Sequence, residues 1–259
     1  MGYIRTLPRM PAKQQPVALT IAGMDSSGGA GVAVDLATFA ALGVGGRSVV
    51  TAVTAQSDKA VFGVQGTRPA MITAQLEAAF QGRKPKAAKC GMLFSGGVVE
   101  AVADFWGGLR VPLVVDPVLA SSSGGSLLSA GGIRVLRRRL LPVCRLVTPN
   151  LTEAEVLTGL KVRGREGMAV AARALFEKYG CAAVVTGGHL KGREVVEMFF
   201  DGREEMTLVS GRVKGNWRGT GCRFSAAVAA GLAKGDSLAT SVAEAKEFVS
   251  TVLKTIDGR

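Results

Sequence analysis

Short apolar segments alternate with segments of helical spacing along most of the chain, and this alternation constrains the fold more than any other feature. The apolar segments have the length and composition of buried strands: residues 17–22, 48–55, 87–93, 113–115, 145–148 and 182–185. Between them, apolar residues recur three and four positions apart, as on one face of a helix. Right-handed crossovers join such strands into a mainly parallel sheet with helices on both faces. The sequence therefore predicts an α/β fold.

The alternation breaks once, in the last third of the chain. Residues 195–200 and 204–209 are strand-like and flank an Asp-Gly pair, which is a hairpin signal. They predict an antiparallel edge on the sheet. Two helices, starting at about Cys222 and Leu238, follow the hairpin.

Composition limits the kind of protein and its location. Residues 1–16 are polar and contain prolines, so we expect a flexible leader followed by a single domain over residues 17–259. No apolar run approaches the roughly 20 residues that span a bilayer, and no signal peptide precedes the first strand. We therefore expect a cytoplasmic protein without a membrane partner. The four cysteines lie far apart without a CxxC pair, which argues against a zinc site and a disulfide framework.

The net charge of +12 suits either a nucleic-acid partner or an enzyme that handles phosphates. Aromatic residues make up only 5% of the chain, and no familiar nucleic-acid motif occurs. The one dense basic run, residues 137–139, lies in a predicted helix and is interpreted as a solvated face. We therefore expect no nucleic-acid partner.

The unusual polar and glycine-rich clusters all follow predicted strands directly. They are residues 23–31, Gln56, Gly91-Met92, Asp116, residues 150–153 and residues 186–189. The carboxyl ends of parallel strands meet at one edge of a sheet, where ligands bind in such folds. The clusters therefore predict one active-site edge.

A glycine turn that ends in a cysteine opens the first of the two C-terminal helices. Arg218, Gly219, Thr220, Gly221 and Cys222 precede an alanine-rich helical run. Backbone amides in the first turn of a helix lack intrahelical partners and favour an anion. The same position would stabilise a thiolate on Cys222. The turn is therefore a candidate phosphate site, although a Gly-Thr-Gly sequence also commonly forms a turn before a helix without any ligand.

Two carboxylates at the predicted edge could hold Mg²⁺, which commonly keeps several waters and needs only one or two protein carboxylates. Glu153, three residues after Asn150, is one of them, and Asp116 is the other. Each also has a structural interpretation. Thr152 could cap the helix with Glu155 as its capping box, and Asp116 could merely end its strand before a proline.

The loop after the first strand matches neither standard nucleotide fingerprint, because it lacks both the lysine of a P-loop and the GxGxxG spacing. Its small residues instead let a flat ligand approach the backbone, with Asp35 one helical turn further on able to bond it. His189 lies in another glycine-flanked loop. It could be an acid or base, or a structural hydrogen bonder.

Together these segments resemble the hydroxymethylpyrimidine and phosphomethylpyrimidine kinases of thiamine synthesis, within the ribokinase superfamily. The resemblance covers residues 17–252 and keeps the family's order of blocks. The blocks are ALTIAGMDSSGGAG at residues 18–31, TAVTAQ at 51–56, KCGML at 89–93, VVDPV at 114–118, TPNLTEAE at 148–155, GGHL at 187–190 and GTGC at 219–222. One block would be weak, but seven in register are specific.

The resemblance implies a ribokinase-like three-layer α/β/α sandwich and a homodimer. It implies ATP-dependent phosphorylation of the hydroxymethylpyrimidine and then of its monophosphate. By position, the pyrimidine contacts would be Gly23, Ala30, Asp35, Gln56, Met92 and Val118. ATP would be held by Asn150, Thr186, Gly188 and Arg218, and Mg²⁺ by Glu153 and Asp116. Gly219, Thr220 and Gly221 would form the anion hole, and Cys222 would be the base.

Departures from the family pattern cluster around the phosphates. The family usually has lysine where this chain has Thr186 and Ser122, and histidine where it has Arg218. Two cationic positions are therefore lost, and Arg218 or Arg193 could restore positive charge. We expect retained kinase activity with altered phosphate contacts. The alternatives are a pyridoxal or pyridoxine kinase, which shares the thiol, and a pyrimidine-binding sensor that has lost the transfer chemistry.

Overall fold

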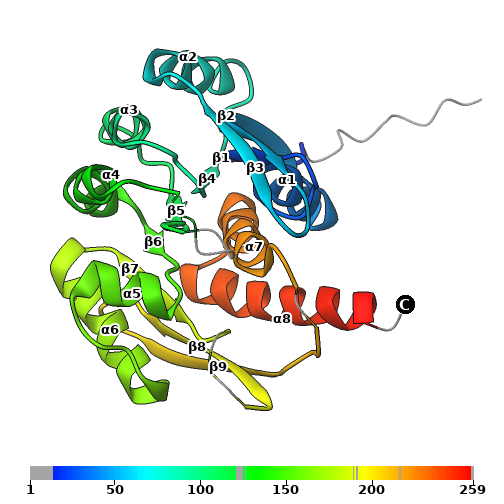
Figure 1. Ribbon diagram of the computed structural model, residues 1–259, viewed down its shortest axis with the longest axis vertical. Helices are drawn as coiled ribbons and strands as arrows, with labels where there is room; N and C mark the ends of the chain where they lie inside the picture. The colour runs from blue at the N-terminus through cyan, green and yellow to red at the C-terminus, as the bar shows by residue number, and fades with distance from the viewer. Residues whose placement is uncertain are drawn as a thin grey trace, which may run out of the picture.

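A nine-stranded sheet forms the centre of the protein, in the order β3-β2-β1-β4-β5-β6-β7-β8-β9 (Figure 1). The computed structural model describes residues 14–120, 125, 127–188, 190, 192–215 and 217–257. The strands are β1 (Val17–Asp25), β2 (Gly45–Gln56), β3 (Val61–Gly66), β4 (Ala87–Cys90), β5 (Leu113–Val115), β6 (Leu146–Val147), β7 (Ala182–Thr186), β8 (Glu194–Phe200) and β9 (Glu205–Gly211).

Six neighbouring strands, β2, β1 and β4 to β7, are parallel, as the alternation of strands and helices predicts. The predicted antiparallel hairpin is confirmed: β8 pairs with β7 and β9 pairs with β8. The other edge strand, β3, was not expected from the sequence. It pairs antiparallel with β2 after a turn in which the Ser57 amide donates to the Ala60 carbonyl, 2.9 Å away.

Helices cover both faces of the sheet. The helices α2 (Pro69–Ala79), α3 (Gly96–Trp106), α4 (Ala130–Val135), α5 (Leu151–Thr158) and α6 (Gly164–Tyr179) lie on one face. A π-helical turn η1 (Leu136–Leu140) and a 3₁₀ turn η2 (Leu141–Val143) continue α4. On the other face lie α1 (Gly31–Ala41), α7 (Thr220–Lys234) and α8 (Leu238–Asp257). The predicted three-layer α/β/α sandwich is confirmed.

Alternation along each buried strand supplies both cores. In β1, Leu19 and Ile21 pack into the core under α2 to α6, whereas Ala18 faces the core under α1, α7 and α8. In β5, Val115 faces the first core and Val114 the second. Successive side chains of a strand point to opposite faces, so a strand buried on both faces is apolar throughout. This explains why the strand segments are continuous apolar runs.

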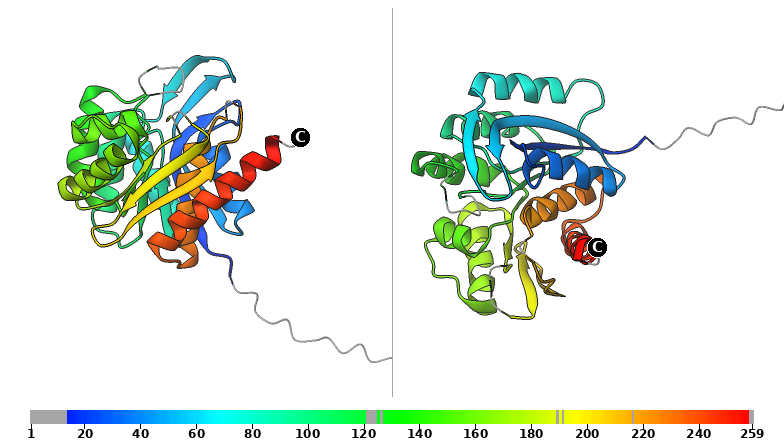
Figure 2. Two further views of the ribbon diagram at one scale, coloured as in Figure 1. Left: turned by 90° about the horizontal axis from the view of Figure 1, so that it is seen from below. Right: turned by 45° about the vertical axis from the view of Figure 1, so that its right-hand side comes forward.

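The last helix lies beside the C-terminal hairpin. Figure 2 shows α8 running along β8 and β9, and Lys246 of α8 donates to the Val195 carbonyl of β8 at 3.1 Å. None of the helices that the structure describes is both long and apolar enough to cross a membrane. Most of the predicted leader, residues 1–13, lies outside the described residues, so the leader and domain boundary stay predictions.

Candidate active site

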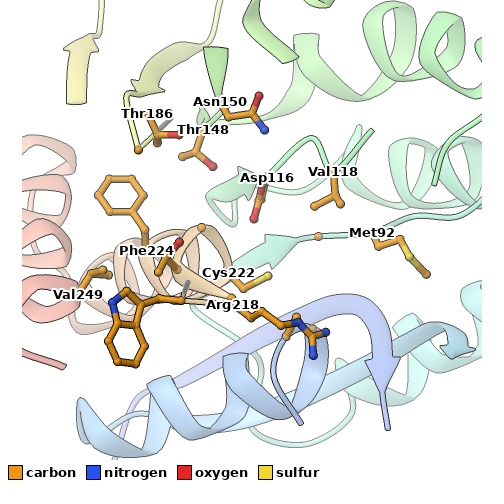
Figure 3. A pocket seen from close by; sticks show the side chains of 18 of the residues that line it. Met92, Asp116, Val118, Thr148, Asn150, Thr186, Arg218, Cys222, Phe224 and Val249 are labelled. Carbon is orange, nitrogen blue, oxygen red and sulfur yellow. The ribbon is translucent and has the colours of Figure 1, made fainter. Parts of the chain in front are cut away.

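A cavity of about 510 Å³ opens at the carboxyl ends of β1, β4, β5, β6 and β7. The start of α7 and one side of α8 close it (Figure 3). Met92 and Val118 lie toward one end, Phe224 and Val249 toward the other, and Cys222 and Asp116 between them. Apart from Asp35, every described residue predicted for the site lines this cavity: Gly23, Ala30, Gln56, Met92, Asp116, Val118, Asn150, Glu153, Thr186, Gly188, Arg218, Gly219, Thr220, Gly221 and Cys222.

The N-terminus of α7 faces the cavity without a side-chain cap. Its N-cap residue, Gly219, has a φ of 69°, a conformation that favours glycine. A Cβ atom at Gly219 would lie 2.3 Å from the Gly29 carbonyl oxygen, so the turn packs directly on the loop after β1. The uncapped amides of the first turn and the helix dipole together would favour an anion at this end of the helix.

Cys222 is partly exposed, whereas the other cysteines, Cys90, Cys144 and Cys181, are buried. Burial raises the pKa of the Cys222 thiol to about 11, while the positive charge of Lys89 acts in the opposite direction. The nearby carboxylates Asp35 and Asp116 raise the pKa further. Without a ligand the thiol is therefore protonated at neutral pH.

A buried ion pair lies beneath this thiol. Lys89 of β4 donates to both carboxylate oxygens of Asp35, at 2.9 and 2.8 Å, and the Thr20 hydroxyl donates to Asp35 Oδ2 at 2.6 Å. Both charged side chains are fully buried. Burial alone lowers the pKa of Lys89, but the charges of Asp35, Cys222 and Asp116 outweigh it and raise that pKa above its ordinary value. Lys89 therefore keeps its positive charge.

This pair gives Asp35 a structural role that the sequence did not predict. Its carboxylate pairs with Lys89, which lines the cavity, whereas Asp35 itself does not line it. A buried lysine in β4 requires a buried counter-charge, and Asp35 supplies it. The direct contact of Asp35 with the ligand stays a prediction.

Asn150 and Glu153 form the N-terminal capping box of α5. The Glu153 amide donates to Asn150 Oδ1 at 3.0 Å, and the Asn150 amide donates to Glu153 Oε2 at 2.9 Å. The alternative cap at Thr152 with Glu155 is therefore wrong. Since the cap uses only Oδ1 of Asn150, the NH₂ group of that side chain can still donate to a ligand.

The carboxylates of Glu153 and Asp116 are buried close to one another. Burial, with the added charge of Asp116, raises the pKa of Glu153 to about 8. Burial likewise raises the pKa of Asp116 to about 6, which Lys89 partly offsets. In the same wall, the buried hydroxyl of Thr148 has no hydrogen-bond partner within the described part of the chain. These two carboxyl groups, which have no ion pair among the described residues, and the Thr148 hydroxyl offer hard oxygen donors that fit Mg²⁺ and its waters.

Arg218 is fully engaged on the opposite wall. Its guanidinium donates to Asp25 Oδ2 at 2.9 Å, Ser27 Oγ at 2.9 Å and Asp58 Oδ1 at 3.0 Å. It also approaches the Ser57 carbonyl at 3.3 Å. Its charge is therefore paired with carboxylates of the β1 and β2–β3 segments, and the contact of Arg218 with the phosphates of ATP stays a prediction.

The far end of the cavity is mostly apolar. Its lining includes Val195, Val213, Trp217, Phe224, Val249 and Leu253. A buried ion pair interrupts it, in which Lys246 of α8 lies 2.5 Å from Glu197 of β8. An apolar slot with a few fixed polar groups suits the aromatic base of a nucleoside.

Comparison with known proteins decides the family. A family model described as phosphomethylpyrimidine kinase matches residues 25–257. The hydroxymethylpyrimidine/phosphomethylpyrimidine kinase of Rhizobium meliloti (strain 1021) is 43% identical over 243 residues, covering 93% of this chain and 91% of that protein. The enzyme of that name from Escherichia coli (strain K12) is 40% identical over 244 residues, 93% and 91% of the two chains. The chain belongs to the phosphomethylpyrimidine kinase family.

Solved structures agree with this membership. The phosphomethylpyrimidine kinase from Clostridium difficile 630 superposes with a TM-score of 0.82 at 33% identity, covering 92% of this chain and 100% of that one. The pyridoxal kinase from Staphylococcus aureus, in complex with AMP-PCP and pyridoxal, gives a TM-score of 0.82 at 33% identity, over 91% and 86% of the two chains. The ribokinase-like fold expected from the sequence is therefore confirmed.

Several cavity residues carry no role in the sequence-based prediction for this family member. They are Asp25, Lys89, Thr148, Glu197 and Lys246. A signal existed for two of them: Lys89 is the one charged residue of β4, and Glu197 lies within the buried apolar run of β8. A charge in a buried strand needs a partner or a function. The partners Asp35 and Lys246 lie far away in sequence, so only the fold identifies them.

The remaining sequence predictions near the phosphates have mixed outcomes. Ser122 and His189 lie outside the described residues. Arg193, considered as a replacement cation, does not line the cavity. Arg212 does line it, and its guanidinium donates to the carbonyls of Gly188 and Gly192, at 2.8 and 2.9 Å.

Proposed function

We propose that this family member transfers the γ-phosphoryl group of ATP to the hydroxymethylpyrimidine of thiamine synthesis and then to its monophosphate. The observation that carries the proposal is the arrangement of one cavity. A slot between Met92 and Val118 and an apolar slot beside Phe224 meet at the uncapped start of α7 and Cys222. Acceptor and donor would therefore meet at an anion site.

The acceptor would lie in the slot between Met92 and Val118. A flat aromatic ring packs well against the thioether of Met92 and the methyl groups of Val118. Gln56 lines the same end of the cavity and offers both a donor and an acceptor to a ring nitrogen and its amino group. The 5-hydroxymethyl group would then point toward Cys222.

ATP would bind with its base against Phe224, Trp217 and Val249 and its phosphates over the first turn of α7. Thr186 and the Asn150 side chain could donate to the phosphates from the opposite wall. Mg²⁺ would be held by Asp116 and Glu153, with water between, and would neutralise charge on the transferring group. Binding the cation would also require both carboxyl groups to lose their protons.

The residues of this chain position and protonate the reactants. In its thiolate form, after losing its own proton to solvent, Cys222 would accept the proton of the acceptor hydroxyl, and the uncapped amides of Thr220 and Gly221 would stabilise negative charge on the phosphoryl oxygens. Lys89, held on Asp35, provides the positive charge that favours the thiolate. Arg212 would supply cationic character beside the Gly188 loop, where the family usually has a lysine.

We also propose that the protein is a homodimer. The β3 edge strand and its surroundings expose the apolar side chains Val53, Phe62, Val64 and Met71, with Phe62 77% exposed. Exposed apolar edges of this kind are usually covered by another chain. Sedimentation equilibrium should give about twice the mass of one chain, and a monomer at micromolar concentration would contradict this.

Product analysis tests the proposed function. The protein is incubated with ATP, Mg²⁺ and one of three acceptors: the hydroxymethylpyrimidine, its monophosphate or pyridoxal. We expect the monophosphate and diphosphate of the pyrimidine, and loss of at least about a hundredfold in rate for Cys222→Ala. Binding of the pyrimidine without any product would instead indicate a sensor, and phosphorylation of pyridoxal alone would indicate the pyridoxal kinase alternative.

A further inference from the structure

The ion pair between Arg218 and Asp25 joins two segments that are distant in sequence at the acceptor end of the cavity. Arg218 Nη2 lies 2.9 Å from Asp25 Oδ2. The side chain of Asp25 is 5% exposed and that of Arg218 is 18% exposed, so water screens this pair little. The second carboxylate partner, Asp58, is 85% exposed and contributes correspondingly less.

Asp25 depends on Arg218 for its neutralisation. Its other carboxylate oxygen accepts hydrogen bonds from the Ser27 amide and hydroxyl, at 2.9 and 2.8 Å, and these partners are uncharged. Among the ion pairs of the described residues, Arg218 is the only cation paired with Asp25. Without Arg218, a nearly buried negative charge would face the cavity uncompensated.

Because of the position of this ion pair, the charge on Asp25 affects the binding of the monophosphate more than the binding of the hydroxymethylpyrimidine. Arg218 directly precedes Gly219, and Gly219 packs on Gly29 of the loop that follows Asp25. A phosphate near Cys222 would therefore lie beside the pair. The hydroxymethylpyrimidine carries no negative charge, whereas a phosphomonoester carries about −1.5 to −2 at pH 7.

We propose that Arg218 is a specificity-determining residue, which admits the already phosphorylated substrate by neutralising Asp25. This inference rests on the proposed function. Arg218 then serves the second phosphorylation without contacting ATP. Its loss leaves a carboxylate that repels the monophosphate through the poorly screened interior of the cavity, while the neutral alcohol is affected only through packing.

The test compares the affinities of the two pyrimidines, measured by calorimetry without ATP, in Arg218→Gln, Asp25→Asn and the double variant. In Arg218→Gln, affinity for the monophosphate should fall about tenfold more than affinity for the alcohol, which corresponds to one unfavourable charge interaction. In Asp25→Asn the ratio should move the other way, because the guanidinium then keeps only the exposed carboxylate of Asp58 as a charged partner. The double variant should return the ratio to near that of the wild type.

Lys59→Gln is the matched control. It removes an exposed positive charge from the turn that also carries Asp58, and the Lys59 side chain forms no hydrogen bond or ion pair with the described residues. Its affinity ratio should stay within about twofold of the wild type, because an exposed charge is screened.

An equal loss of affinity for both pyrimidines in Arg218→Gln would overturn the inference, since it would indicate that the ion pair is purely structural. So would an unchanged ratio in all three variants. If Arg218→Gln does not fold, the affinity ratios of Asp25→Asn and of the double variant test the inference. Neither of these variants has an unpaired Asp25 carboxylate. A wild-type protein that binds both pyrimidines but makes no product would contradict the proposed function alone, because the affinity ratio needs no turnover.

Discussion

At the scale of single residues, the site depends on charges that the strands bury. Lys89 has neighbours in β4 that are all apolar, and its charge is tolerated because Asp35 and Thr20 hold it. The lysine lowers the pKa of the Cys222 thiol, and Asp35 raises it by less. Asp35 therefore acts on the thiol through Lys89, as a positioning residue.

Replacing this pair should change the reactivity of Cys222. Lys89→Met alone would leave Asp35 buried and unpaired, at a cost of roughly 3–5 kcal/mol, so the double variant Lys89→Met with Asp35→Asn is preferred. In it, alkylation of Cys222 by iodoacetamide at pH 8 should slow by about threefold to tenfold, because the thiol pKa rises further. Mass spectrometry of the peptide that carries Cys222 measures the rate.

The control is the other buried pair of the cavity. Lys246→Met with Glu197→Gln removes a similar ion pair, whose lysine is not among the groups that shift the pKa of Cys222. Its alkylation rate should match the wild type. The same slowing in both double variants would show that the effect is structural rather than electrostatic.

At the scale of elements, the start of α7 determines the geometry of the proposed anion site. Gly219 adopts a left-handed conformation, and its close contact with the Gly29 carbonyl leaves no room for a side chain. Gly235, at the C-terminal end of the same helix, is also left-handed, with φ of 100°, but a Cβ atom there would meet nothing within 4 Å. Both glycines have a positive φ, but only Gly219 is closely packed. Comparing substitutions at the two positions therefore distinguishes the effect of backbone strain from the effect of close packing.

Gly219→Ala should therefore lower the melting temperature and abolish measurable phosphoryl transfer, because the backbone amides of α7 must move. Gly235→Ala should cost only about 1 kcal/mol of strain and leave kcat and KM within about twofold of the wild type. Thermal unfolding and steady-state kinetics of both variants check this. Full activity in Gly219→Ala would mean that the amides of this turn do not bind the transferring phosphate.

Sequence patterns predicted the helices and strands better than they predicted the ion pairs between side chains. The six parallel strands and the β8–β9 hairpin follow from apolar runs and one Asp-Gly turn. The β3 strand was missed because residues 61–66 are largely exposed and two of the six are glycines, so they lack the pattern of a buried strand. Topology placed the predicted residues on strand ends at one cavity, whereas the ion pairs of Asp35 and Arg218 were not predicted, because pairs between distant segments leave no local signal.

At the scale of the whole molecule, the two buried carboxylates give stability a pH dependence. The pKa of Glu153 in the folded protein, about 8, exceeds its ordinary value, and so does the pKa of Asp116, about 6. When the pKa of an acid is higher in the folded protein than in the unfolded chain, the folded protein binds the proton more tightly. Stability is then lost as pH rises from the ordinary pKa toward the folded one.

Glu153→Gln should remove much of this dependence and keep the capping box, since glutamine serves at that position as well as glutamate. Between pH 5 and pH 8, the melting temperature of the ligand-free wild type should fall relative to that of the variant. Scanning fluorimetry measures the difference, with exposed Glu247→Gln as the control expected to follow the wild type. A difference that stays constant over this range would contradict the raised pKa. The variant should also bind Mg²⁺ and ATP more weakly.

Part of the cavity wall comes from α8, which is the last helix to be synthesised. Val249, Ser250 and Leu253 line the cavity together with residues from β1, more than 200 positions earlier in the chain. The cavity is therefore complete only after the last helix has been synthesised. A product truncated before α8 would lack this wall and also the core residues Leu238, Val242 and Ala245.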